Sequence, residues 1–138
     1  MFFLGFPLLL IPFAVYNIVA FILRMPDDFW TAQATVVHMM SGQEWKLTWE
    51  DILLVVSILL LAVEMIKSTR MGVRAIVDHV LAMVLFVIML VEFLLVQRAG
   101  TSTFFLLTTI CLVDVLVGFI VSIRSSQRQV EVDTERAA

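Results

Sequence analysis

Four long apolar stretches run through this chain, and three of them contain acidic residues. The stretches cover about residues 2–23, 49–66, 73–96 and 104–123, and each approaches the about 20 residues that a helix needs to cross a bilayer. A carboxylate in hydrocarbon is costly, so each acid must face protein, lie near an interface, find a partner or stay protonated. The acids concerned are Glu64, Asp78, Glu92 and Asp114. We therefore expect an all-α integral membrane protein, a single domain over residues 1–138 that forms a bundle of four transmembrane helices with a polar interior.

The composition argues against a soluble domain. Hydrophobic residues make up 62% of the chain, whereas globular proteins have about 45–50%. The apolar runs are continuous and lack the alternation of a membrane β-barrel. A helix also satisfies its backbone hydrogen bonds within one segment. The first stretch lacks a positively charged start and is longer than the core of a signal peptide, so we interpret it as a retained helix.

The basic residues predict the orientation in the membrane. The connections that follow the second and fourth stretches hold six of them, and the other two connections hold three. Basic residues favour the cytoplasmic side, which predicts a multi-pass protein of the bacterial inner membrane with both termini in the cytoplasm. Residues 25–48 then form an outer loop, and residues 125–138 form a cytoplasmic tail.

The outer loop contains a predicted β-hairpin. Residues 35–40 and 44–49 are rich in β-branched and aromatic side chains and flank Ser41-Gly42-Gln43. An interfacial helix over residues 29–40 is the alternative. Thr48 and Asp51 have capping-box spacing, which predicts that the second helix starts at Trp49. The loop either covers the outer end of the bundle or docks another membrane or periplasmic protein.

Charged residues gather where the second and third stretches meet. Glu64 and Asp78 each lie seven positions from Met71, at the centre of the connecting turn, so an antiparallel pair places them at similar depth. The predicted inner polar cluster consists of Glu64, Lys67, Arg74, Asp78 and His79. It locks the two helices through ion pairs, with basic side chains reaching water; a cytoplasmic entrance for protons or cations is the alternative.

Asp114 lies near the middle of the fourth stretch. Small or polar residues at helical spacing form a packing stripe beside it, which lets helices approach closely in lipid. The stripe consists of Thr108, Cys111, Gly118 and Ser122. Together with Tyr16 and Asn17 of the first stretch, and with Glu92, Asp114 forms a candidate buried polar site. It is interpreted either as a hydrogen-bonded acid that fixes packing or as a site that responds to a proton, a cation or a partner's cation.

No catalytic constellation is present, so we expect no enzyme activity and no cofactor. Cys111 is the single cysteine, which excludes an intramolecular disulfide. His38 in the outer loop and His79 near the inner turn lie on opposite sides, so one protomer cannot offer both to one haem or metal ion. No basic face for nucleic acid is present.

Several motifs resemble those of a known group. They are the run 101–108, Asp114-Val115, Gly118-Phe119 and 121–123, preceded by Glu64, residues 67–70 and Asp78-His79. From residue 41 onward the chain is similar to small four-helix inner-membrane proteins of alphaproteobacteria. The resemblance implies a fold and a compartment, but no activity. Small multidrug transporters have a similar size, but they carry an essential glutamate in their first helix, where this chain has no acid.

The sequence thus predicts an accessory or assembly subunit that packs against a larger membrane complex. Its expected partners are the lipid bilayer and another membrane protein or further copies of this chain. The alternative is a small oligomeric transporter or channel, coupled to protons or cations through Asp114 and Glu92.

Overall fold

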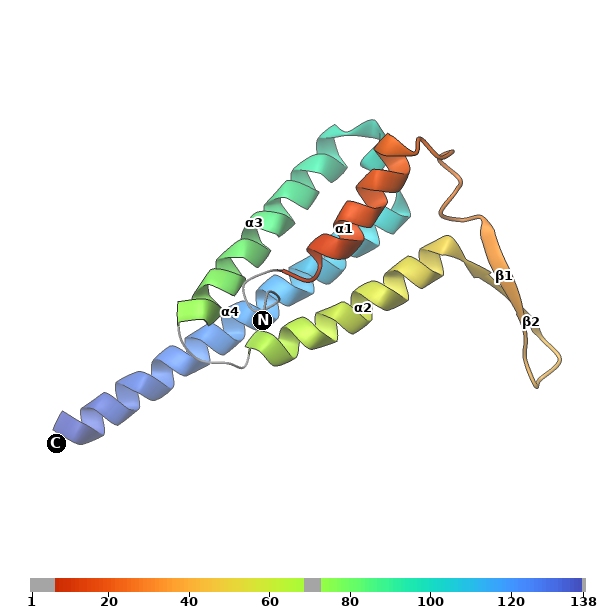
Figure 1. Ribbon diagram of the computed structural model, residues 1–138. Coiled ribbons are helices and arrows are strands. Elements are labelled where there is room, and N and C mark those ends of the chain that lie inside the picture. Colours follow the sequence, from red (N-terminus) through yellow and green to blue (C-terminus); the bar gives the residue numbers. More distant parts are fainter. Residues whose placement is uncertain (1–6, 69–72, 138) are drawn as a thin grey trace.

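The protein is mostly helical, with one small β-hairpin (Figure 1). The computed structural model describes residues 7–68 and 73–137. The elements in chain order are α1 (Leu10–Asn17), the π-helical turn η2 (Ile18–Ile22), β1 (Gln33–His38), β2 (Glu44–Thr48), α2 (Trp49–Ser68), α3 (Val73–Leu95), the 3-10 turn η3 (Gln97–Ala99) and α4 (Ser102–Ala137). The predictions of a largely helical fold and of a β-hairpin are confirmed.

Helix α4 is the centre of the bundle. It packs against both α2 and α3, which contact each other much less. Helix α1 contacts α2 and α4 and passes in front of α4 in Figure 1. The buried core joins Tyr16 of α1, Leu53 and Leu61 of α2, Leu85 and Met89 of α3, and Phe104, Leu107 and Cys111 of α4.

Among the described residues, two helices are long and apolar enough to cross a membrane. Their spans are Ile76–Leu95 in α3 and Ser102–Val121 in α4, each of 20 residues. Helix α2 also has 20 residues, but Glu50, Asp51, Glu64 and Lys67 shorten its apolar part. The apolar helix Leu10–Ile22 is about 20 Å long at 1.5 Å per residue, which is shorter than a bilayer core.

The first helix begins at Leu10, eight residues after the start of the predicted span. Residues 2–6 of that span lie outside the described part. Pro12 lies in the first turn, where a missing N–H costs little because it has no partner within the helix. At the other end, the Leu23 N–H bonds to the Ile18 carbonyl, and Arg24 adopts a left-handed conformation with φ of 48°. This conformation ends the helix there.

The second helix starts as the capping-box spacing predicts. The Thr48 N–H donates to Asp51 Oδ2 at 3.0 Å, and the Asp51 N–H donates to Thr48 Oγ1 at 3.2 Å. These reciprocal bonds satisfy donors at the helix start, so the expected start at Trp49 is confirmed.

Helix α4 continues well past the predicted span that ends at Ile123. It has 36 residues, and at 1.5 Å per residue its length is about 54 Å. The predicted tail is therefore a helical extension up to Ala137, while residue 138 lies outside the described part. Figure 1 shows this extension leaving the bundle, and we call that side the tail end.

The hairpin does not cover the opposite end of the bundle, which we call the hairpin end. Its antiparallel strands pair Val37 with Trp45 and His38 with Glu44, and Gly42 turns the chain with φ of 86°. Figure 1 shows the hairpin pointing away to the side of α2. The preceding loop covers the end instead: the Glu50 N–H donates to the Trp30 carbonyl, and the Trp49 N–H to the Ala32 carbonyl.

Candidate functional site

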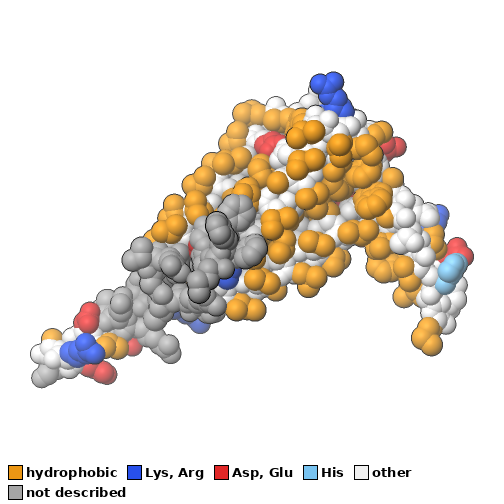
Figure 2. Space-filling view, viewed as in Figure 1, with side chains coloured by type: hydrophobic (Ala, Val, Ile, Leu, Met, Phe, Trp, Pro, Cys, Tyr) orange, Lys and Arg blue, Asp and Glu red, His pale blue; other side chains and the backbone are white. Residues whose placement is uncertain are grey.

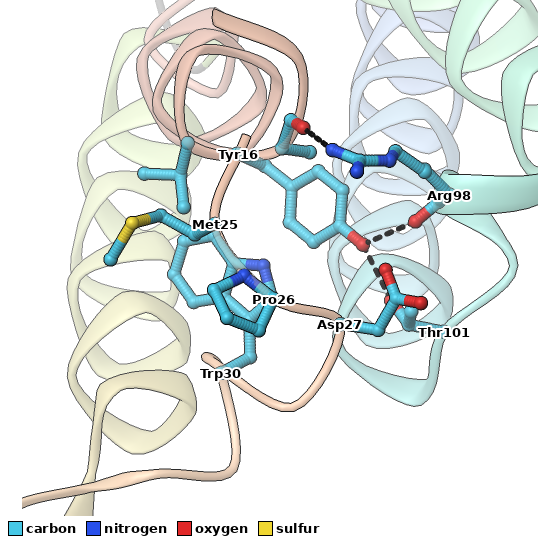
Figure 3. Close-up of a pocket in the computed structure, with 9 residues that line it drawn as sticks. Tyr16, Met25, Pro26, Asp27, Trp30, Arg98 and Thr101 are labelled. Atoms are coloured by element: carbon cyan, nitrogen blue, oxygen red, sulfur yellow. Dashed lines mark hydrogen bonds between the residues drawn. The ribbon is translucent and has the colours of Figure 1, made fainter. Parts of the chain in front are cut away.

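Tyr16 is the centre of a polar cluster at the hairpin end. Its side chain is 1% exposed. Its hydroxyl donates to the Arg98 carbonyl at 3.1 Å and lies 2.7 Å from Thr101 Oγ1 (Figure 3). Thr101 also accepts the Phe104 N–H and so caps the start of α4. This Tyr16 cluster, with Arg98 and Thr101, ties α1 to the α3–α4 connection.

Arg98 closes the end of the first helix. Its Nη1 donates to the Ala20 carbonyl, on the last turn of η2. The last carbonyls of a helix lack partners within the helix and carry partial negative charge. The guanidinium satisfies one of these carbonyls, while the Arg98 carbonyl accepts from Tyr16. Arg98 therefore binds the first helix through both its side chain and its backbone.

Aromatic rings surround the Tyr16 hydroxyl contacts. The Tyr16 ring stacks on Trp30 with centroids 5.1 Å apart and meets Phe104 edge-on at 5.0 Å. A small pocket of ≈ 10 Å³ lies beside them, lined in part by Met25, Asp27 and Arg98. This is about the space that one water needs.

Glu92 and Asn17 lie together near the Tyr16 cluster. The Asn17 side chain lies beside the Glu92 carboxyl, and its Nδ2 donates to the Phe13 carbonyl at 3.0 Å. Glu92 is close enough to act electrostatically on Tyr16. Three of the four residues of the candidate buried polar site are thus neighbours.

Asp114, the fourth, lies elsewhere. It is 10 positions after Phe104, which contacts Tyr16, so helix geometry places it about 15 Å further along α4. Its charged neighbours are Glu64 and Lys67, and it is 6% exposed. The structure therefore does not bring Tyr16 and Asn17 to Asp114.

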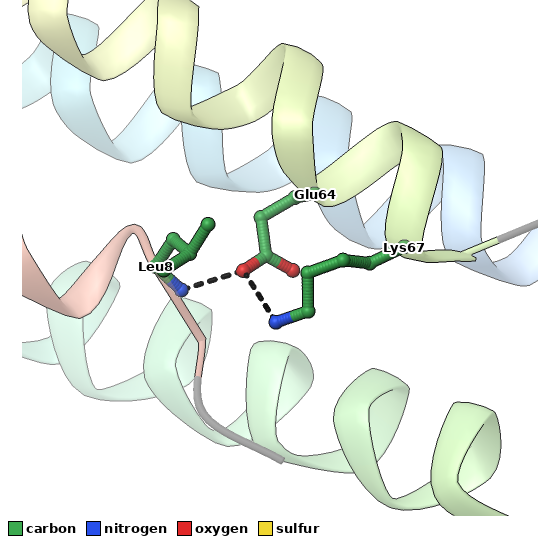
Figure 4. Close-up of polar contacts among 3 residues, drawn as sticks. All are labelled: Leu8, Glu64 and Lys67. Carbon is green, nitrogen blue, oxygen red and sulfur yellow. Dashed lines mark hydrogen bonds and ion pairs between the residues drawn. The ribbon is translucent and has the colours of Figure 1, made fainter. Parts of the chain in front are cut away.

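Glu64 is the centre of a second cluster, toward the tail end. It is 5% exposed. Its Oε1 accepts the Leu8 N–H at 2.6 Å and lies 3.4 Å from Lys67 Nζ (Figure 4). One carboxylate from α2 thus satisfies the backbone just before α1. We call Leu8, Glu64, Lys67 and Asp114 the Glu64 cluster.

His79 of the predicted inner polar cluster packs directly on α4. A Cβ atom added at Gly118 would lie 2.5 Å from His79 Nδ1. The absence of a side chain at Gly118 therefore makes room for the imidazole. The imidazole also lies beside the Phe119 ring, with the two ring centroids 6.3 Å apart. Asp78 precedes His79 on α3. The Arg74 side chain and the turn at 69–72 lie outside the described part, so an ion pair between Arg74 and Asp78 stays a prediction.

The packing stripe of α4 points into the bundle at three described positions, Thr108, Cys111 and Gly118. Thr108 is 6% exposed and donates to the Phe104 carbonyl, and Cys111 is 1% exposed and donates to the Ala82 carbonyl of α3. Gly118 contacts His79, as above. The Ser122 side chain lies outside the described part. Cys111 and Gly118 of the stripe therefore lie against α3.

The described residues contain no group of three or more His, Cys, Asp or Glu side chains that could hold a metal ion. Sequence reasoning missed the roles of Trp30, Arg98 and Thr101. A signal for Arg98 was present: it is a cation in the connection between the third and fourth stretches, and helix C-termini attract cations.

A scan against protein-family models and searches of curated proteins and of solved structures find no match to this chain. The resemblance to small inner-membrane proteins therefore stays a prediction.

Proposed function

We propose that the chain is an integral protein of the bacterial inner membrane, with all four helical segments in the bilayer and both termini in the cytoplasm. The distribution of exposed side chains carries this proposal. Only 17% of the span in α3 and 33% of the span in α4 are buried inside the protein. The core helix of a soluble protein would be mostly buried, whereas lipid covers such faces in a membrane. Large exposed side chains include Ile58, Leu59, Val87, Leu116 and Phe119.

The short first helix is compatible with a membrane position. Backbone groups at membrane depth need partners within the protein. The Leu8 N–H, just before α1, has such a partner in Glu64, and the Ala20 carbonyl, near the end of η2, has one in Arg98. One backbone group near each end of this short segment is therefore satisfied by a side chain of another element.

Within the membrane, we propose an accessory or assembly role against a larger membrane complex. The polar side chains described above connect chain segments: Tyr16 joins the first helix to the α3–α4 connection, and Glu64 joins α2 to the start of α1. The pocket near Tyr16 lies at the other end of the bundle from the Glu64 cluster. Polar groups used in this way support a packing role.

A small oligomeric transporter or channel, coupled to protons or cations, is the second candidate. It is favoured by the proximity of two buried acids, Glu64 and Asp114, to one ammonium, Lys67. Such a group of charges can exchange a proton or a cation if water reaches it.

The Asp114→Asn variant separates the two candidates. Asparagine keeps the size and polarity of the side chain but cannot release a proton or attract a cation. Purified full-length protein is reconstituted in vesicles, and proton and cation flux is measured for both variants. In parallel, each variant is purified in mild detergent from the native host, and co-purifying membrane proteins are quantified.

The accessory role predicts no flux with either variant and a stoichiometric membrane partner that both variants retain. Flux that the native protein supports and the folded Asp114→Asn variant loses would overturn it in favour of the transporter. Gly118→Leu serves as a control, because bulk at the His79 contact should disturb the bundle in either case.

A further inference from the structure

The two faces of the β-hairpin differ in character. Paired residues of antiparallel strands share a face, and successive residues alternate between faces. The pairs Val37–Trp45 and Thr35–Leu47 therefore lie on one face, and the pairs His38–Glu44 and Val36–Lys46 lie on the other. The first face is apolar apart from Thr35, whereas the second holds the charged residues of the strands.

The apolar face is exposed in the isolated protein. Val37 is 40% exposed and Trp45 is 47% exposed, and the tip adds Met39 at 49% and Met40 at 107%. A two-stranded hairpin on its own is marginally stable in water and needs another layer against its apolar face. Some other surface must therefore supply that layer.

The direction of the hairpin indicates which surface this is. Figure 1 shows it leaving the start of α2 sideways, across the direction of α2. If α2 crosses the membrane, a segment in this position runs along the membrane surface. In Figure 2 the histidine and acidic side chains of the hairpin lie on its side away from the helices, and a hydrophobic side chain marks its tip.

We propose that the hairpin Gln33–Thr48 lies in the headgroup region of the outer leaflet, with its apolar face toward the lipid chains. This proposal rests on the membrane insertion proposed above. The lipid-facing surface of α2 continues into the hairpin through Trp49, which is 42% exposed and stacks on Phe29. Indole rings such as those of Trp45 and Trp49 favour this level of a bilayer. The charged face, with His38, Glu44 and Lys46, faces the water outside.

The charges of the hairpin also predict which lipids it accepts. Glu44 and Lys46 carry opposite charges, and His38 lies 3.5 Å from the Glu44 carboxylate. The face has little net charge, so attraction to anionic headgroups is weak. Insertion should therefore be similar in vesicles of phosphatidylcholine alone and in vesicles that also contain phosphatidylglycerol.

Neighbouring positions on β1 provide a matched test. In full-length protein with Cys111→Ser, a single cysteine is placed by Val37→Cys or by His38→Cys and labelled with an environment-sensitive fluorophore. The protein is reconstituted in phosphatidylcholine vesicles. Quenching by a lipid-borne nitroxide is compared with quenching by aqueous iodide. A third label, from Val87→Cys on the exposed face of α3, reports membrane insertion itself.

We expect the label at Val37→Cys to show a higher ratio of lipid to aqueous quenching than the label at His38→Cys. The label at Val87→Cys should show a high ratio. Equal, iodide-dominated quenching at positions 37 and 38, with Val87→Cys still quenched from lipid, would overturn the hairpin proposal alone. Protection of position 37 from both quenchers would also overturn it, in favour of a second copy on this face. Loss of lipid quenching at Val87→Cys would instead overturn the membrane insertion.

Discussion

At the hairpin end of the bundle a buried phenol bonds to neutral groups, whereas toward the tail end a buried carboxylate bonds to a backbone N–H and an ammonium. The Tyr16 cluster combines hydroxyl and carbonyl contacts with stacked rings. The Glu64 cluster places two acids near Lys67. Both clusters hold an end of the same short first helix.

The comparison shows how a helix too short to span the bilayer is kept in place. Each end presents backbone groups without a partner inside the helix, and each end receives a side chain from another element. The two solutions should differ in how much stability depends on one residue. At the hairpin end the Tyr16 hydroxyl bonds to neutral groups, and such hydrogen bonds contribute about 1 kcal/mol each. Breaking a buried ion pair, such as that of Glu64 with Lys67, costs about 3–5 kcal/mol.

The largest loss is expected from Glu64→Ala. This change removes the acceptor of the Leu8 N–H and takes the carboxylate away from Lys67, whose side chain is 11% exposed. We expect the free energy of unfolding to fall by about 3 kcal/mol, measured by denaturant titration in mixed micelles. Glu64→Gln is the control: it keeps an acceptor for Leu8 but no charge, so its loss should be smaller. A loss no larger than that of Tyr16→Phe would refute the contrast between the two ends.

Gly118→Ala should have the next largest effect, because the new Cβ would lie 2.5 Å from His79 Nδ1. Overpacking of this kind costs about 1–3 kcal/mol. Gly100→Ala is the matched control, since its Cβ would meet only the Gln97 carbonyl at 3.4 Å. Adding His79→Ala to Gly118→Ala should cost less than the sum of the two single changes. Simple additivity would show that the two residues do not share this contact.

Tyr16→Phe should have the smallest effect of the three. It removes the hydroxyl that meets the Arg98 carbonyl and Thr101, while the stacking on Trp30 remains. The expected loss in unfolding free energy is about 1 kcal/mol, in the same titration. Thr109→Val, which removes an exposed hydroxyl bonded to Phe105, should change stability little. Equal losses of unfolding free energy from these two variants would show that the buried Tyr16 hydroxyl stabilises the protein no more than an exposed hydroxyl does.

The features that depend on neighbouring residues were predictable from the sequence. The hairpin follows from β-branched and aromatic residues around Gly42, and the start of α2 follows from the spacing of Thr48 and Asp51. The small residues beside Asp114 indicated a close helix contact on α4. That pattern did not predict that His79 fills the space over Gly118.

The partners of Asp114 were not predictable, because they depend on where the first helix starts. If the first helix began at residue 2, Tyr16 and Asn17 would lie at about the same depth in the bundle as Asp114. The helix instead starts at Leu10, and Tyr16 lies beside Thr101 at the first residues of α4. Just before this start, the Leu8 N–H bonds to Glu64, 56 positions away, and no local pattern contains such a contact.

We propose that the bundle spans the membrane, with the hairpin outside and the α4 extension in the cytoplasm. Cysteine labelling tests it most directly. In a Cys111→Ser background, Ser41→Cys marks the hairpin loop and Ala137→Cys marks the end of α4. Membrane-impermeant maleimide should label Ser41→Cys in intact spheroplasts and Ala137→Cys only after the membrane is opened. Labelling of Ala137→Cys in intact spheroplasts, or recovery of the protein in the soluble fraction, would contradict the account.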